Sequence, residues 1–315
     1  ISTIAVAQDL VINNGRILDG KGGVIENGSV VIRNGRIASV AAGSQNIAGM
    51  QTINAGGKTV MPGFVEGHRH VIDGDAGTWL SQTAPQQMQE FLDAGFTTVL
   101  SAIDAPPIVA ARNQIAAGQM QGPRLFTGTF IPVAGADPEA APSAPGDPAR
   151  TDPARIGGAD KAAPAMPRAA IIAMIEAAKA AGYDYLKCVV NTTPGGPEID
   201  TLKFIVEEGN KRGMPTIVHA VSVKDSAAAI DAHPAMLVHT PHIGRLDQDA
   251  AALQKIATAG IPMTSTLSVF LPHFDADGVA LFRDAQAFPW ETLSSAGQGP
   301  VNARLLWEAG IVYGY

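Results

Sequence analysis

The stretch VMPGFVEGHRHVIDG, residues 60–74, decides the fold: an apolar run leads directly into two histidines one residue apart. A short apolar segment that ends in polar residues is typical of a strand in a parallel sheet with functional groups at its carboxyl end. On an extended segment, His68 and His70 share one side because side chains alternate. Alone, the motif fits half of a metal site and equally fits two surface histidines.

From residue 60 onward, short apolar segments alternate with helical ones. The expected strands are residues 60–65, 97–103, 124–130, 185–190, 215–221, 236–240, 261–267 and 310–315. The expected helices are residues 84–95, 107–118, 167–182, 198–213, 223–232, 247–260 and 301–310, several of which end in glycine as helix C-caps do. Eight strands that alternate with helices predict an α/β fold, a parallel (β/α)8 TIM-like barrel.

The first part of the chain has a different pattern of apolar and turn-forming residues. Short alternating or apolar runs are separated by Asn-Gly and Gly-Gly pairs, the pattern of β-hairpins. The tetrapeptide NGRI occurs at residues 14–17 and 34–37, and it predicts two similar turns. We therefore expect a small, incomplete N-terminal β-sandwich at residues 1–59 and the barrel, itself incomplete, at residues 60–315.

Polar residues at the ends of the expected strands are few. His68 and His70 end the first strand, His219 the fifth and His239 the sixth, and Lys187 lies in the apolar fourth strand. Because the carboxyl ends of barrel strands meet at one face, we expect these side chains to converge there. Burial of Lys187 would depress its pKa toward the neutral amine.

Composition limits the class of partner. The net charge is −7 without a basic run, which argues against nucleic acid and anionic membranes as partners. No apolar run reaches the roughly 18 residues of a transmembrane helix. Cys188 is the single cysteine, which excludes an intrachain disulfide, and it should face away from Lys187 as a buried apolar residue.

Two segments leave alternatives open. Residues 1–7, ISTIAVA, fit the end of a signal peptide, which favours a periplasmic or secreted protein, and also fit an extended strand of a cytoplasmic one. Residues 134–165, rich in Pro, Ala, Gly and Asp, form either a lid over the barrel mouth or filler without a role there.

With these residues in view, the chain closely resembles the amidohydrolase superfamily. The family's opening signature is matched by PGFVEGHRH at residues 62–70, followed by the strand-four lysine and the histidines of strands five and six. AGFTTV at residues 94–99 and GPRLF at residues 122–126 also look like the family's entries into strands two and three. The resemblance runs from about Asp9 onward and includes the N-terminal sandwich.

The resemblance implies a binuclear metal centre. By position, His68 and His70 would bind the more buried metal, His219 and His239 the second, and Lys187, carboxylated by carbon dioxide, would bridge the two. Imidazole and oxygen ligands without thiolate suit zinc, with manganese, cobalt or iron as alternatives.

The implied reaction is hydrolysis of an amide-type C–N bond in a small molecule, by attack of a metal-bridging hydroxide on a polarised carbonyl. The prolidase- and imidazolonepropionase-like branch is nearest, so the substrate is a non-peptide amide or a dipeptide. One alternative is a deaminase of an aminated heterocycle, but Ala220, Val221 and Ser222 lack the expected glutamate shuttle. The other is a non-catalytic assembly protein, and homo-oligomerisation stays open.

The sequence departs from the family pattern at its end. The catalytic aspartate expected after strand eight would lie beyond Tyr315, and Asp275, Asp277 and Asp284 precede the last helix and strand. We therefore expect a fragment of a longer enzyme that is inactive as given. His242, Asn191 and His273 are the candidate substrate-binding residues. Arg69, Thr192 and Thr266, in loops after the strands, are further candidates for substrate selection.

Overall fold

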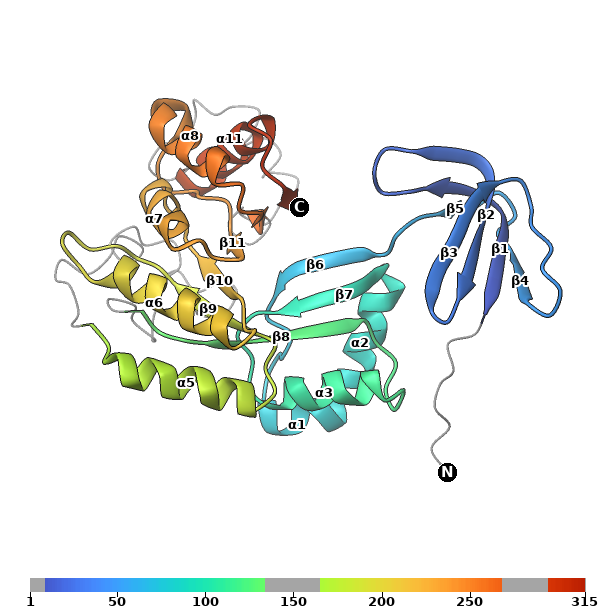
Figure 1. The fold of residues 1–315 in the computed structure, drawn as a ribbon, viewed down its shortest axis with the longest axis horizontal. Helices are drawn as coiled ribbons and strands as arrows, with labels where there is room; N and C mark the ends of the chain where they lie inside the picture. The colour runs from blue at the N-terminus through green and yellow to red at the C-terminus, as the bar shows by residue number, and fades with distance from the viewer. Residues whose placement is uncertain (1–8, 134–164, 268–293, 315) are drawn as a thin grey trace. The chain divides into compact units, whose positions relative to one another are not determined.

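The computed structural model describes residues 9–133, 165–267 and 294–314. Its N-terminal strands are β1 (Leu10–Leu18), β2 (Val24–Arg33), β3 (Arg36–Ala42), β4 (Gln51–Asn54) and β5 (Thr59–Val60). They form one sheet in the order β3-β2-β1-β4, in which β5 also pairs with β1 (Figure 1). β1 runs antiparallel to β2 and parallel to β4 and β5. Alternate residues of β1 are buried, including Val11 and Ile17, as expected for a strand with one covered face.

The two NGRI segments adopt different structures. Asn34 and Gly35 both have positive φ, 51° and 70°, and connect β2 to β3 as a tight hairpin turn. Asn14, with φ of 57°, lies inside β1, where the pairing with β2 shifts register between Ile12 and Gly15. The prediction of two similar turns is therefore wrong for residues 14–17, which form a β-bulge. Asn-Gly favours left-handed backbone, and both a bulge and a hairpin turn use it.

The eight remaining strands form a second sheet. They are β6 (Phe64–Arg69), β7 (Phe96–Ser101), β8 (Arg124–Phe130), β9 (Tyr185–Val189), β10 (Thr216–His219), β11 (Met236–Val238), β12 (Met263–Thr264) and β13 (Tyr313–Gly314). They hydrogen-bond in chain order from β6 to β13, and the pairings from β8 to β13 are parallel. The sheet curls round, because a Cβ on Gly67 of β6 would lie 3.2 Å from Thr264 Oγ1 of β12. This confirms the predicted (β/α)8 barrel beside a small N-terminal β-structure.

Helices connect the barrel strands. They are α1 (Ala76–Gln82), α2 (Ala84–Asp93), α3 (Pro107–Ala116), α5 (Arg168–Ala180), α6 (Glu198–Lys211), α7 (Val223–Ala229), α8 (Ala250–Ala259) and α11 (Ser294–Glu308), with 3-10 turns at Ile230–Ala232 and Leu246–Gln248. All seven expected helices are present. Two expectations need correction: the first barrel strand begins at Phe64 instead of residue 60, and α1 was not expected.

The chain divides into two compact units. One comprises residues 1–66, 80–98 and 111–124, and the other comprises residues 67–79, 99–110 and 125–315. The predicted domain boundary between residues 59 and 60 stays a prediction. In the described parts of the chain, no helix is both long and apolar enough to cross a bilayer.

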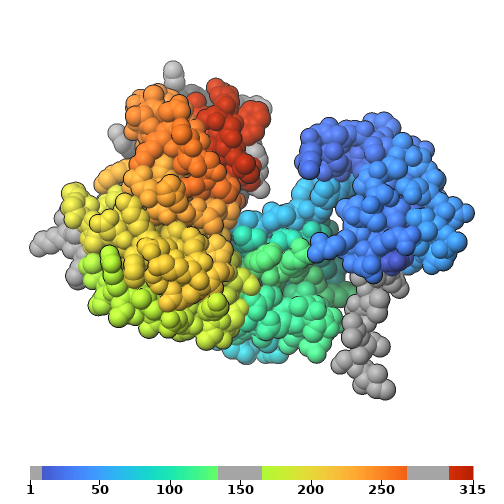
Figure 2. Space-filling view, in the orientation of Figure 1, coloured from blue at the N-terminus to red at the C-terminus, as the bar shows by residue number. Residues whose placement is uncertain are grey.

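Helices α5 to α8 cover the outer face of strands β9 to β11. Figure 2 shows them as one continuous layer, and each contacts the next along the chain. Beneath this layer lies a large apolar core that includes Ile175, Leu186, Cys188, Leu202 and Leu237. A smaller cluster of Tyr185, Ile217 and Val238 alternates with it along the strands and therefore occupies the barrel interior. The interior side of these strands is the side that carries the candidate site.

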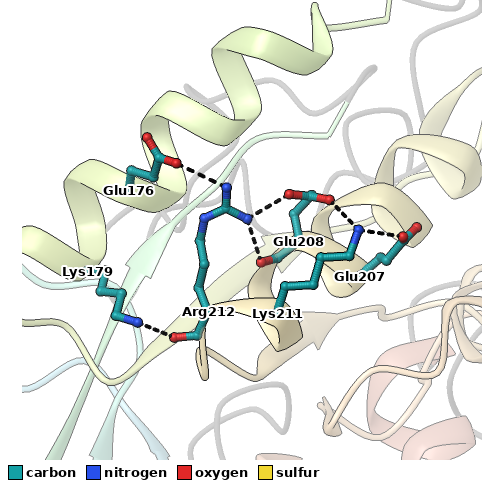
Figure 3. Close-up of polar contacts among 6 residues, drawn as sticks. All are labelled: Glu176, Lys179, Glu207, Glu208, Lys211 and Arg212. Atoms are coloured by element: carbon teal, nitrogen blue, oxygen red, sulfur yellow. Dashed lines mark hydrogen bonds and ion pairs between the residues drawn. The ribbon is translucent and has the colours of Figure 1, made fainter.

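An ionic network joins the carboxyl ends of α5 and α6 (Figure 3). Arg212 donates to Glu176 Oε1 at 3.0 Å and to Glu208 Oε2 at 2.6 Å, while Lys179 Nζ donates to the Arg212 carbonyl at 2.7 Å. Lys211 bonds Glu208 as well, and these hydrogen bonds lower the pKa of the Glu208 carboxyl. The cations compensate the negative end of each helix dipole and hold the two helices in register.

Candidate functional site

The candidate ligands lie at the carboxyl ends of four barrel strands, all within the second compact unit. His68 is in β6 and His70 directly follows it, Lys187 is in β9, His219 ends β10, and His239 follows β11. Lys187 is in register with Ile217 of β10 and Phe130 of β8. Parallel pairing brings these ends to one face of the barrel, as the sequence predicts.

The four imidazoles lie in a row, His70–His68–His239–His219, with each ring next to the following one. The ring centroids of His68 and His70 are 5.4 Å apart, those of His68 and His239 4.9 Å, and those of His219 and His239 4.3 Å. Each pair meets edge to face, with interplanar angles between 71° and 80°. His239 is buried, His68 and His219 are half-buried, and His70 is exposed. The structure thus brings together four histidines that are separated by up to 171 residues.

The backbone turns His239 toward this cluster. Val238 faces the barrel interior, so strict alternation would direct residue 239 to the helix-covered side. Instead, His239 has φ of 80°, a conformation that non-glycine residues rarely adopt and that is typical of functional sites. Its Nδ1 lies 2.5 Å from Oγ1 of Thr266, whose own φ is 46°. Thr266, expected as a loop residue, therefore orients the imidazole through one ring nitrogen.

Burial and charge keep the histidines neutral. Desolvation, followed by the Lys187 charge, lowers the pKa of His68 and His219 well below the ordinary value. Desolvation and neighbouring imidazolium charges do the same for His239. The pKa of His70 is also lowered, although the Asp104 carboxylate acts in the opposite direction. Neutral imidazole is the form that binds metals.

Lys187 faces the imidazoles from β9. It is 1% exposed, and its Nζ has no hydrogen-bond partner among the described residues. Burial lowers the pKa of this amine well below its ordinary value, so the group is held toward its neutral, nucleophilic form. Cys188 lies in the apolar core on the opposite side of β9, as predicted, and burial raises the pKa of its thiol to about 12.

The segment after the first two histidines is held by Asp104. Its carboxylate accepts hydrogen bonds from the backbone N–H of Val71 at 2.9 Å and of Ile72 at 3.1 Å, and from the Ser101 hydroxyl. The sequence reasoning missed Asp104. Its position three residues after the end of β7, where polar residues at barrel strand ends gather, is the signal that identifies it.

The predicted substrate-binding residues have different surroundings. His242 is 2% exposed, and burial lowers the pKa of its imidazole to about 4. Its loop is tied to α11 by Asn302, whose side-chain amide donates to the carbonyls of Pro241 and Gly244 and accepts from Leu246 N. Asn191 is half-buried and lies on a cleft of about 670 Å³ between the loop after β9 and helices α7 and α8.

Three earlier expectations lie outside the described residues. They are the substrate-binding role of His273, the nature of residues 1–7, and all but the last residue of the segment 134–165.

The donor chemistry of the cluster fits divalent cations. It offers neutral imidazoles and a buried amine without a hydrogen-bond partner, a group that reacts with carbon dioxide when neutral. As they stand, no three His, Cys, Asp or Glu side chains of the described residues are arranged to hold a metal ion, since the rings contact one another. The potential donor groups of this cluster are the side chains of His68, His70, Lys187, His219 and His239.

Comparison with known proteins agrees with the fold and the motifs. The model of the amidohydrolase family matches residues 59–296, more than half of the chain. The chain belongs to the amidohydrolase family.

Curated relatives are matched over shorter segments. Similar proteins include L-hydantoinase of Paenarthrobacter aurescens, 36% identical over 67 residues, and a dihydroorotase of Trichlorobacter lovleyi, 30% identical over 102 residues. An adenine deaminase of Listeria welshimeri is 41% identical over 63 residues. These matches cover 21%, 32% and 20% of this chain and span only 14%, 24% and 10% of the relatives' own lengths.

Solved structures share the fold over nearly the whole chain. A putative prolidase from Bifidobacterium longum is 19% identical with a TM-score of 0.70, and 98% of this chain covers 73% of it. An Xaa-Pro dipeptidase with bound methionine in its active site is 20% identical with a TM-score of 0.69, and 98% of this chain covers 79% of it. At this identity the likeness concerns the fold.

Proposed function

We propose that the protein is a binuclear metal-dependent hydrolase that cleaves an amide-type C–N bond of a small molecule. The observation that carries the proposal is the convergence of four imidazoles, linked by three ring contacts, with the buried amine of Lys187. Membership of the amidohydrolase family supports the general class of metal-dependent hydrolase.

Each residue of the site has a distinct proposed role. His68 and His70 would hold one cation and His219 and His239 the second, and Lys187, as a carbamate, would supply anionic oxygen ligands to the site. Bound there, divalent cations such as zinc would polarise the scissile carbonyl and supply a nucleophilic water at neutral pH. Thr266 fixes the His239 ring through Nδ1, which leaves Nε2 as the ligating nitrogen. His242 and Asn191 orient the substrate.

Several relatives support an amide-type substrate. They include a hydantoinase, dihydroorotases and, among solved structures, a prolidase complexed with N-methylphosphonate-L-proline. We propose a compact amide or dipeptide as the substrate class.

Deamination is the second candidate, because an adenine deaminase is among the relatives. The residues after His219 speak against it. Ala220 and Val221 are buried apolar residues, and the Ser222 hydroxyl caps α7 by accepting from Asp225 N at 2.9 Å. None of the three can carry a proton to a ring nitrogen as a glutamate would.

Metal analysis and a substrate screen test the proposal. The intact protein, reconstituted with zinc and bicarbonate, should bind about two metal ions per chain and hydrolyse N-acyl amino acids, dipeptides or cyclic amides. H219A and H239A should each reduce the metal content, whereas H233A, a histidine at the end of a 3-10 turn, should not. Fewer than about one metal ion per chain, or ammonia release from aminated heterocycles with no amide cleaved, contradicts the proposal.

A further inference from the structure

We propose that Asp104 is a positioning residue that holds the His68–His70 segment in its ligating geometry. This inference rests on the proposed metal-dependent function and extends it to a residue that the sequence pattern does not mark. Asp104 acts on the two histidines indirectly, through the backbone that follows them.

The direct contacts define the role. Both carboxylate oxygens are used, since Oδ2 accepts from Val71 N at 2.9 Å and Oδ1 accepts from Ile72 N at 3.1 Å. The contact partners are the two residues immediately after His70, where β6 has ended and no strand pairing remains to fix the backbone. A carboxylate that accepts from two successive backbone amides determines the direction in which the chain leaves the strand.

Asp104 is itself anchored to the barrel. The Ser101 hydroxyl donates to its carboxylate, and the Tyr183 hydroxyl donates to its carbonyl oxygen at 3.1 Å. The Tyr185 hydroxyl donates to the Ser101 carbonyl at 2.6 Å in a fully buried contact. Contacts from the β9 region, which carries Lys187, therefore fix the loop that in turn fixes the two histidines of β6.

The same loop reaches the segment from a second side. Ala102 N donates to the carbonyl of Arg69, the residue between the two histidines, at 2.8 Å. His70 also has a hydrogen bond with the backbone of Ile103 and lies within the field of the Asp104 carboxylate. Groups from three consecutive residues of this loop, residues 102–104, thus act on the segment 69–72. Carboxylates and carbonyls behind a ligating histidine fix the orientation of its ring and raise its basicity.

Asp225 provides a matched control elsewhere in the barrel. Its carboxylate accepts from Thr192 N at 2.8 Å, from Thr192 Oγ1 at 2.6 Å and from Ser222 Oγ at 2.6 Å. It therefore joins two loops at the same barrel face with the same kind of contact. Its partners Thr192 and Ser222 lie five and three residues after the nearest candidate ligands, whereas those of Asp104 directly follow His70. A general loss of loop order should affect both aspartates alike, whereas a loss of ligand positioning should affect Asp104 alone.

The experiment compares D104N, D225N and the unchanged sequence in the intact protein. Zinc affinity is measured by competition with a chromophoric chelator, thermal unfolding by circular dichroism, and backbone order by hydrogen exchange without added metal. D104N should raise the Kd for zinc by about 10- to 100-fold and accelerate exchange at residues 71 and 72. D225N should accelerate exchange near Thr192 and leave the zinc Kd within about twofold, which is the purely structural response.

Each outcome is decisive. Unchanged zinc affinity in D104N, or an equal loss in D225N, overturns the positioning role while leaving the proposed function intact. Failure of the unchanged sequence to bind zinc overturns the proposed function itself, and the role with it. If D104N does not fold, S101A decides: it keeps the carboxylate, removes one hydroxyl donor, and should weaken zinc binding by a smaller factor. Unchanged affinity in S101A then counts against the role.

Discussion

Replacement of Lys187 by methionine should separate stability from metal binding. The side chain is 1% exposed, and its Nζ makes no hydrogen bond with any described residue. An unsatisfied buried polar group costs about 1–3 kcal/mol, and methionine fills a similar volume without one. K187M should therefore increase the free energy of unfolding by about 1–3 kcal/mol when a chelator keeps metal away.

With excess zinc, the unchanged protein should instead be more stable than K187M. A site occupied at 100 times its Kd adds about 2.7 kcal/mol to the stability of the unchanged protein, and K187M should gain far less. K187A is the control, because it removes the amine together with its aliphatic stem. The cavity that it leaves should destabilise the protein by about 2–5 kcal/mol in chelator.

Urea denaturation of the three proteins, with chelator and with zinc, gives these free energies directly. The reasoning is refuted if K187M in chelator is less stable than the unchanged protein by more than about 1 kcal/mol. That result would mean that the Lys187 amine has a stabilising partner, and that its burial does not reduce the stability of the folded protein.

Three further substitutions test other parts of the structure. Burial lowers the pKa of His242 to about 4, so as the pH falls the unfolded chain binds a proton at this residue before the folded protein does. The contribution of neutral His242 to stability is therefore complete above pH 6.5 and is lost as the pH falls through 4. Between pH 6.5 and pH 4, H242Q should lose about 3 kcal/mol less stability than the unchanged protein, as measured by urea denaturation at both pH values. An equal loss in the two proteins would contradict the prediction. G128A would place a Cβ 2.3 Å from the Tyr185 ring, so it should cost about 1–3 kcal/mol in the same assay, and a neutral effect would contradict the close approach. E208Q removes the charge that binds Arg212 and should lower the Tm, most strongly at low salt; a salt-independent change would argue against an ionic cause.

Much of the architecture could be predicted from local sequence. Apolar runs, terminal glycines and Asn-Gly pairs gave the number and order of barrel strands and the helices between them, because these signals act over a few residues. The convergence of His68, His70, Lys187, His219 and His239 followed from topology, since the ends of parallel strands share a face. Helix α1 was missed although Asp75 caps it by accepting from Thr78 N at 3.0 Å.

The rest of the site depends on backbone geometry and long-range contacts. The alternation rule directs His239 away from the site, and only its left-handed backbone, with φ of 80°, turns it back. Asp104 acts on residues 32 and 33 positions earlier in the chain, a separation at which sequence spacing carries no information about contact. Asn14 and Asn34 carry the same local signal and differ because pairing with neighbouring strands decides between bulge and turn.

The position of Cys188 gives the protein an internal reporter. This thiol is the only one in the chain, it is fully buried, and it lies directly behind Lys187 on the other face of β9. A thiol reagent can reach it only when the helix layer separates from that strand, so the labelling rate measures the free energy of that opening. The strand that carries the central candidate ligand can thus be followed in the native protein without an introduced label.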